Sequence, residues 1–299
     1  MQGKKVLFTG GQGPVSFPAA RQLASDNEVF AVARFSDPKG REKLEGVGIT
    51  CLVHDLLQPF DDMRSDFDYI FHSALPPYAP LGTWPHSYDA YAYATGRLMA
   101  HCNQAQGFVF ASSISTYDPP GGDTDVPETR PFGIHTTPAY SFTKVANEAV
   151  VTYVSRSLNI PTTIIRIGSA SGVDGGPMRN RLDRVVRGEP IPLSPDRPNY
   201  FRPIFEPDAA TLGIAALEAG RVPPLVVNWC GEDTVSVEDY CTYMGELIGK
   251  VPQFEYTDAA YGPLVPDTTF MHEVLGHGQV KWRDGCRMLV EQCYPDLLK

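Results

Sequence analysis

The chain has 299 residues, of which 42% are hydrophobic and 20% charged, and its formal net charge is −10. A chain of this size buries a substantial core, either as one large domain or as one domain with a smaller lobe. The negative charge, without any block of lysine and arginine, argues against nucleic acid or an anionic membrane as a partner. The sequence also lacks the roughly 20 consecutive apolar residues of a membrane span and the apolar run of a signal peptide.

Short apolar runs alternate with longer amphipathic segments along most of the chain. Runs without polar alternation are typical of parallel strands that are covered on both faces. Strands are predicted at 5–9, 28–33, 49–53, 68–72, 107–112, 162–167 and 225–229, and helices at 14–25, 86–105, 138–157 and 208–219. The pattern predicts an α/β fold with a Rossmann-type doubly wound parallel sheet.

The last third of the chain contains irregular segments rich in proline and aromatic residues, around 190–205 and 251–269. We predict a sheet-bearing domain over residues 1–170, which also takes in 205–230. A smaller, interleaved C-terminal lobe occupies most of 171–299. The six cysteines are scattered, without a CxxC pair, so we expect free thiols in a reducing cytoplasm rather than disulfides or a zinc site.

The first predicted strand runs directly into Gly10-Gly11-Gln12-Gly13-Pro14-Val15. Glycines at a strand-to-helix turn let the backbone approach a pyrophosphate, which the helix start then stabilises. An ordinary tight turn is the alternative, but the position at the first such junction favours a dinucleotide site. The residues 1–170 are therefore the expected NAD(P)-binding domain, and the C-terminal lobe is the expected substrate-binding part.

The second predicted strand ends at Arg34, where an NAD site would carry an acidic residue for the ribose hydroxyls. Arginine can bind a ribose 2′-phosphate bidentately, so Arg34 favours NADP(H), with NAD(H) as the other possibility. A solvated surface arginine is the alternative interpretation. Asp55, after the third strand, is a candidate adenine contact or the cap of a turn.

The strongest catalytic candidates are Tyr140 and Lys144, four residues apart near the start of a predicted helix capped by Thr137. An ammonium beside a phenol lowers the phenol pKa from its usual value near 10, so the tyrosine can exchange a proton with a carbinol oxygen. Ser113 follows the predicted strand 107–112, where its hydroxyl would lie at the ligand-binding edge of the sheet.

With these motifs, the sequence resembles the extended short-chain dehydrogenase/reductase family, which includes nucleotide-sugar epimerases and dehydratases. The resemblance implies that Ser113 holds the substrate oxygen, Tyr140 is the general acid/base, and Lys144 lowers the tyrosine pKa and contacts the nicotinamide ribose. It further implies a homodimer. The cofactor-binding residues expected on this basis are Gly10, Gly11, Gln12, Gly13, Pro14, Val15, Arg34, Asp55, Leu56, Ser73, Ala74, Leu75, Lys144 and Ile167, and the substrate-binding residues are Ser112, Ser115, Tyr93 and Arg202.

The sequence departs from the family pattern at several positions. Ser16 replaces the third glycine, Tyr93 replaces a frequent asparagine, and segment 166–173 lacks the asparagine that often contacts a sugar nucleotide. Arginines gather between Arg179 and Arg202, either as an anion site or as a salt-bridged surface. The acidic pair of sugar dehydratases is missing after Ser113, which makes dehydration improbable.

We therefore expect an NADP(H)-dependent oxidoreductase that transfers hydride between the nicotinamide and a small-molecule secondary alcohol or ketone. A nucleotide-sugar epimerase with tightly bound NAD is the main alternative, and a redox-inactive dinucleotide sensor is the third. His272 and His277 suggest a zinc-protease motif, but their spacing of five residues does not fit HExxH, so no metal site is predicted.

Overall fold

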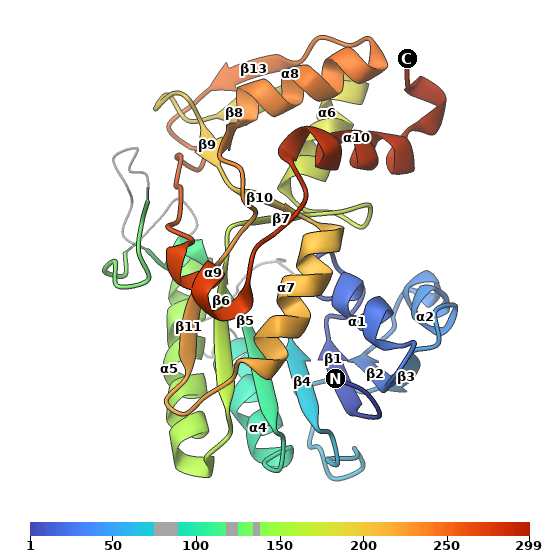
Figure 1. Ribbon diagram of the computed structural model, residues 1–299, viewed down its shortest axis with the longest axis vertical. Helices are drawn as coiled ribbons and strands as arrows, with labels where there is room; N and C mark the ends of the chain where they lie inside the picture. The colour runs from blue at the N-terminus through green and yellow to red at the C-terminus, as the bar shows by residue number, and fades with distance from the viewer. Residues whose placement is uncertain (75–88, 118–124, 134–137) are drawn as a thin grey trace.

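A computed structural model describes residues 1–74, 89–117, 125–133 and 138–299, and Figure 1 shows their arrangement. The expected Leu75 cofactor contact and the Thr137 helix cap therefore lie outside the described residues. Among the helices within these ranges, none is long and apolar enough to cross a membrane. All six cysteines are unpaired.

A seven-stranded parallel sheet forms the centre of the N-terminal domain, in the order β11-β6-β5-β4-β1-β2-β3. Its strands are β1 (Lys5–Thr9), β2 (Glu28–Ala33), β3 (Thr50–Val53), β4 (Tyr69–His72), β5 (Gly107–Ser113), β6 (Thr162–Ile167) and β11 (Leu225–Trp229). Every neighbouring pair is parallel. The doubly wound fold class expected from the apolar runs is confirmed: each run corresponds to a strand of the parallel sheet, and all of these strands except the edge strand β3 are largely buried.

Helices cover both faces of this sheet (Figure 1). On one side lie α1 (Phe17–Leu23), α7 (Glu206–Glu218) and α9 (Thr269–Leu275), and on the other α4 (Ala94–His101) and α5 (Pro138–Leu158). Successive residues of β1 serve the two cores alternately: Phe8 packs in the first, and Leu7 packs in the second. This period of two is what a strand requires when both of its faces are covered.

The C-terminal lobe has its own hydrophobic core. It contains α6 (Pro177–Arg187), α8 (Val237–Ile248), α10 (Trp282–Cys293), and the parallel pair β8 (Pro190–Leu193) and β13 (Gln253–Tyr256). Short pairs, β7 (Ser169–Ser171) with β10 (Pro203–Phe205) and β9 (Tyr200–Phe201) with β12 (Val235–Ser236), lie where the chain passes between sheet and lobe.

Three elements differ from the sequence expectation. Helix α1 begins at Phe17, which places Pro18 in the first turn, where its missing N–H removes no helical hydrogen bond. Helix α2 (Pro38–Glu45) was not predicted, because its residues are almost entirely polar; Asp37 caps it by accepting a hydrogen bond from the Lys39 amide. The predicted helix 86–105 is divided into a π-helical turn, η1 (Asp89–Tyr93), followed by α4.

Candidate active site

The glycine loop between β1 and α1 packs tightly against the end of β4. Gly10 has φ +67°, and a Cβ there would lie 2.8 Å from the Ala74 nitrogen, so no other residue fits without strain. Ser16 is buried and donates its hydroxyl to the Gly10 carbonyl at 2.9 Å, while Ser73 Oγ lies 3.0 Å away. The serine that replaces the third glycine therefore closes the loop instead of disrupting it.

A cavity of about 350 Å³ opens beside this loop. It is lined by Gly10, Gly11, Gln12, Gly13, Ala31, Val32, Ala33, Phe35, Leu44, Ser73 and Asp174. Small side chains and glycine backbone along one wall leave room for a pyrophosphate, and the apolar wall from β2 suits an adenosine moiety. The residues present therefore fit a dinucleotide. The half-buried Pro14 and Val15 continue the loop, and Ile167 ends β6 on the same sheet.

Arg34 and Asp55, two residues of the expected dinucleotide site, are not among the residues that line this cavity. Arg34 is exposed and makes no hydrogen bond or ion pair within the described part of the chain. The Asp55 carboxylate accepts a hydrogen bond from the Leu57 amide at 3.0 Å, so it caps a turn next to half-buried Leu56. The capping role was one of the two alternatives for Asp55.

Lys43 on α2 is a second cation at this site that the sequence did not indicate. Its ammonium donates to the Gln12 carbonyl at 3.1 Å, forms an ion pair with Asp174, and lies 3.5 Å from the Phe17 ring centroid. These contacts join α2 and the segment after β7 across the glycine loop. Without α2 among the predicted elements, no sequence signal placed Lys43 here.

The proposed catalytic residues lie on adjacent elements. Ser113 ends β5 and is 9% exposed; its Oγ accepts a hydrogen bond from the Ser115 amide at 3.1 Å. Lys144 on α5 is buried, and its Nζ donates to the Ala111 carbonyl at 2.6 Å and lies 5.7 Å from the centroid of the Tyr140 ring. The structure thus brings the ammonium to the tyrosine, as the i, i+4 spacing predicted.

Burial controls the charge on Lys144. Desolvation lowers the pKa of this ammonium to about 7, although the nearby Glu148 carboxylate acts in the opposite direction. His72, at the end of β4, is also buried, and desolvation together with the charge of Lys144 lowers the pKa of His72 to about 3. The imidazole is therefore neutral across the physiological range, and Lys144 is the titratable cation of the pair.

The hydrogen bonds of His72 define its tautomer. Thr95 donates its own hydroxyl hydrogen to the Tyr91 carbonyl, so its oxygen accepts from His72 Nε2 at 2.8 Å. His72 Nδ1 must then accept from Thr9 Oγ1, which lies 2.7 Å away and itself accepts from the Ala74 amide. This chain ties β1, β4 and α4 together below the glycine loop.

A buried ion pair supports the strand that carries Ser113. Glu148 accepts two hydrogen bonds from Arg166, at 3.0 and 2.7 Å, and one from the Ser112 hydroxyl at 2.5 Å. Burial lowers the pKa of Arg166, but the hydrogen bond and charge of Glu148 outweigh it, so the net shift is upward. Ser112, which we expect to contact the substrate, is 1% exposed and donates its hydroxyl to Glu148.

Comparisons with known proteins now bear on this geometry. Residues 6–222 match the NAD dependent epimerase/dehydratase family. The chain belongs to this family.

Solved structures of similar fold include MoeE5 in complex with UDP-glucuronic acid and NAD, at 24% identity, a TM-score of 0.81, and 98% of this chain matched to 100% of that one. UDP-glucuronic acid 4-epimerase from Bacillus cereus, with UDP-glucuronic acid and NAD, gives 19% identity, a TM-score of 0.82, and coverage of 97% and 100%. TunA, an NAD dependent NDP-hexosamine 5,6-dehydratase, gives 20% identity and a TM-score of 0.78, with 96% of this chain matched to 97% of that one. No curated protein sequence matches.

As a member of the epimerase/dehydratase family, the protein is an enzyme of the short-chain dehydrogenase/reductase type. The comparisons do not support the NADP preference expected from Arg34, because the similar structures are described with NAD. They also favour the epimerase alternative over the simple oxidoreductase.

The arginine cluster of the lobe is largely paired internally. Arg179 binds Asp183 at 2.7 Å, Arg181 binds the Tyr240 hydroxyl, Arg184 donates to the Pro190 carbonyl, and Arg187 binds Glu189. The salt-bridged interpretation therefore accounts for Arg179 and Arg187, while Arg181 and Arg184 are held by neutral oxygens.

Arg202 differs from the other arginines. It is half-buried and donates to the Glu232 carbonyl at 3.3 Å and to Thr268 Oγ1 at 2.9 Å, and its Nη2 lies 3.8 Å from the Asp125 carboxylate in an ion pair. Its buried Nε makes no hydrogen bond to any residue in the described ranges. Arg202 thus retains a donor for a ligand.

The two remaining substrate candidates differ in exposure. Ser115 is buried, and its hydroxyl oxygen makes no hydrogen bond within the part of the chain that the structure describes. Tyr93 ends η1, is 60% exposed and packs under the Arg97 guanidinium. Its environment is that of a surface aromatic, and it does not reproduce the amide that the family often has there.

Proposed function

We propose that the protein is a nucleotide-sugar epimerase that inverts a hydroxyl-bearing carbon of its substrate at a tightly bound NAD. The observation that carries the proposal is the arrangement of Ser113, Tyr140 and Lys144 at the carboxyl edge of the sheet that also holds the glycine loop. The match to the family and the similarity in fold to UDP-sugar 4-epimerases along nearly the whole chain support this choice.

Each side chain has a role that its contacts permit. Ser113 Oγ accepts from the Ser115 amide, so its own hydrogen remains for donation to the substrate oxygen. Tyr140 takes the proton of the substrate hydroxyl and returns it after the intermediate ketone has turned its other face. The nearby Lys144 ammonium favours the tyrosinate form. When bound, the nicotinamide supplies the hydride acceptor and donor.

Arg202 is the candidate anchor for the anionic part of the substrate. Its guanidinium is held by a backbone carbonyl, a hydroxyl oxygen and a longer ion pair with Asp125, and its buried Nε has no hydrogen-bond partner among the described residues. An arginine with a free donor suits a phosphate oxygen. The paired arginines of α6 contribute to the stability of the lobe rather than to this site.

A second candidate function is an NADP(H)-dependent reductase of ketones, and Arg34 is the observation that favours it. Its guanidinium lies directly after β2 and is free of protein partners in the described ranges, as a 2′-phosphate site would require. The two functions differ in cofactor retention, because an epimerase must regenerate its own cofactor in each cycle.

The cofactor experiment separates them. Protein purified without added nucleotide is denatured, and the released dinucleotide is identified by mass spectrometry; Arg34→Ala is analysed in parallel. Stoichiometric NAD, unchanged in Arg34→Ala, is the expected result. An empty site that binds NADPH reversibly, and loses that affinity in Arg34→Ala, would overturn the epimerase proposal.

We also propose that the protein forms a homodimer through α4 and α5. These helices pack together on one side of the sheet, and α5 exposes Tyr153 and Leu158 at 72% and 40% of their surface. Exposed apolar side chains on one helix suit a helix-to-helix interface. Analytical ultracentrifugation of wild type and Tyr153→Glu tests this. The wild type is expected to sediment as a dimer and the variant as a monomer. A wild-type protein that sediments as a monomer would contradict the proposal.

A further inference from the structure

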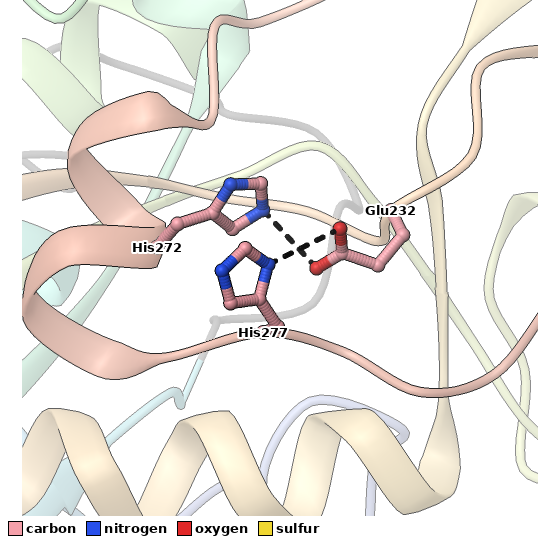
Figure 2. A group of neighbouring side chains, drawn as sticks. All are labelled: Glu232, His272 and His277. Atoms are coloured by element: carbon pink, nitrogen blue, oxygen red, sulfur yellow. Dashed lines mark ion pairs between the residues drawn. The ribbon is translucent and has the colours of Figure 1, made fainter.

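Three side chains with metal-ligand atoms meet on the α9 side of the sheet, apart from the proposed catalytic residues. Glu232 follows β11, His272 lies on α9, and His277 follows that helix. Figure 2 shows both imidazoles turned toward the two oxygens of the Glu232 carboxylate. His272 Nε2 lies 3.1 Å from Glu232 Oε1, and His277 Nδ1 lies 3.7 Å from Glu232 Oε2.

The end of α9 explains how two histidines five residues apart come together. The helix stops at Leu275, and Gly276, with φ +91°, reverses the chain direction. His277 then folds back onto His272, so that the ring centroids lie 4.1 Å apart with 26° between the planes. Helical spacing alone would have placed the two rings on different faces.

The contacts match a shared ion better than a hydrogen-bonded triad. His272 Nε2 is buried and makes no hydrogen bond to a described residue, although the carboxylate oxygen is only 3.1 Å away. The His277 distance of 3.7 Å exceeds a hydrogen bond. Two ligands of one tetrahedral zinc ion lie about 3.4 Å apart, given metal distances of about 2.1 Å. The distances from His272 Nε2 to Glu232 Oε1, 3.1 Å, and from His277 Nδ1 to Glu232 Oε2, 3.7 Å, lie on either side of that value.

The surroundings hold the carboxylate in place. The Gly278 amide donates to Glu232 Oε1 at 2.7 Å, a contact of the kind that orients a metal-binding carboxylate. All the ligand atoms lie within 4.8 Å of one another, so a small closure would bring them around one ion. His277 is 63% exposed, which leaves access for the ion and a position for a water ligand.

We propose that Glu232, His272 and His277 form a binding site for a divalent transition-metal ion, with Zn²⁺ as the best chemical match. Two imidazoles and one carboxylate are borderline ligands that suit this ion, and the fourth position is open to water. The site is independent of the proposed epimerase activity.

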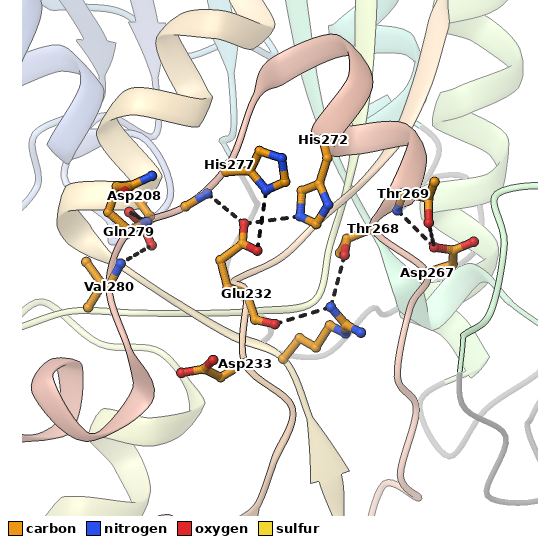
Figure 3. Close-up of polar contacts among 12 residues, drawn as sticks. Asp208, Glu232, Asp233, Asp267, Thr268, Thr269, His272, His277, Gln279 and Val280 are labelled. Atoms are coloured by element: carbon orange, nitrogen blue, oxygen red, sulfur yellow. Dashed lines mark hydrogen bonds and ion pairs between the residues drawn. The ribbon is translucent and has the colours of Figure 1, made fainter.

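The ion would stabilise the link between sheet and lobe. Residues 276–281 connect α9 to α10, and carboxylates already hold this connection. Asp208 accepts from the Gln279 and Val280 amides (Figure 3). Asp233 accepts from the Trp282 amide. A metal at Glu232 would fasten the start of the same connection to the end of β11. The Glu232 carbonyl also accepts from Arg202, so the substrate lobe adjoins this anchor.

Calorimetric titration with ZnCl₂ tests the site directly, using tag-free protein treated with EDTA and dialysed. Co²⁺ serves as a second probe, since its visible absorption reports the coordination geometry. The variants are His277→Ala, which removes an exposed side chain, and Glu232→Gln, which keeps an oxygen for the Gly278 amide. Glu273→Gln, an exposed acid on α9 outside the cluster, is the matched control.

We expect one Zn²⁺ per chain, with affinity reduced at least tenfold in both site variants and unchanged in Glu273→Gln. The melting temperature is expected to rise by roughly 5 °C at a zinc concentration of about 100 times Kd, in wild type and the control only. Binding that survives His277→Ala, or no stoichiometric binding by a wild-type protein that remains folded by circular dichroism, would overturn the proposal.

Discussion

The proposed chemistry depends at the residue scale on the phenol of Tyr140 and the charge of Lys144. Removing the phenol oxygen leaves no group to exchange the substrate proton, so Tyr140→Phe is expected to lower kcat by about 10²- to 10⁴-fold. Bound cofactor should be retained, because the glycine loop is untouched. Tyr256→Phe, at an exposed position on β13 away from the helices of the proposed dimer, is the control and should retain full activity. A Tyr140→Phe enzyme with normal kcat would show that this phenol is not the acid/base.

The buried ammonium of Lys144 is also expected to make the stability of the folded protein depend on pH. Its pKa is lowered by burial to about 7 in the folded protein, against about 10.4 in an unfolded chain. Between these values the unfolded state binds more protons, so stability rises with pH. The free energy of unfolding of wild type minus that of Lys144→Met should increase between pH 7 and 9, by at most about 1.4 kcal/mol per pH unit. Denaturant titrations at several pH values measure it, and a flat difference would refute the buried, depressed ammonium.

At the element scale, the Glu148–Arg166 pair joins α5 to β6 behind the strand that carries Ser113. Glu148→Gln leaves a buried arginine without its anion and is expected to cost about 3–5 kcal/mol of unfolding free energy. Glu45→Gln, which breaks the exposed Arg41–Glu45 pair, should change stability little. Urea denaturation compares the two variants. Similar small losses in both would mean that the buried pair does not hold these elements together.

Features that lie within one element could be predicted from the sequence, whereas contacts between elements could not. The strands, the glycine loop and the Tyr140–Lys144 pair follow from local spacing, and the structure has them within one or two residues of the expected bounds. The partners of Glu148 and His72 depend on which strands become neighbours, so no local pattern indicates them. His272 and His277 were set aside because they do not fit one helix; the turn at Gly276 brings them together instead.

At the scale of the whole molecule, the two parts of the chain have different proposed tasks. The N-terminal domain, with its sheet and α5, contains the dinucleotide cavity and the proposed catalytic residues, and the lobe contains its own core and the paired arginines. Arg202 lies where the chain passes between them, so it can meet the anionic end of a substrate whose reacting carbon lies over the sheet. Because that position depends on the lobe packing, the sequence could suggest Arg202 only by resemblance.

The most direct test of the central claim is to follow a UDP-hexose or UDP-hexuronic acid by NMR in the presence of the purified enzyme, without added cofactor. We expect that a second epimer appears and reaches equilibrium with no net oxidation, and that Tyr140→Phe slows this conversion by at least about 10²-fold. No epimer from any such substrate with an NAD-loaded enzyme, together with NADPH-dependent reduction of simple ketones, would contradict it.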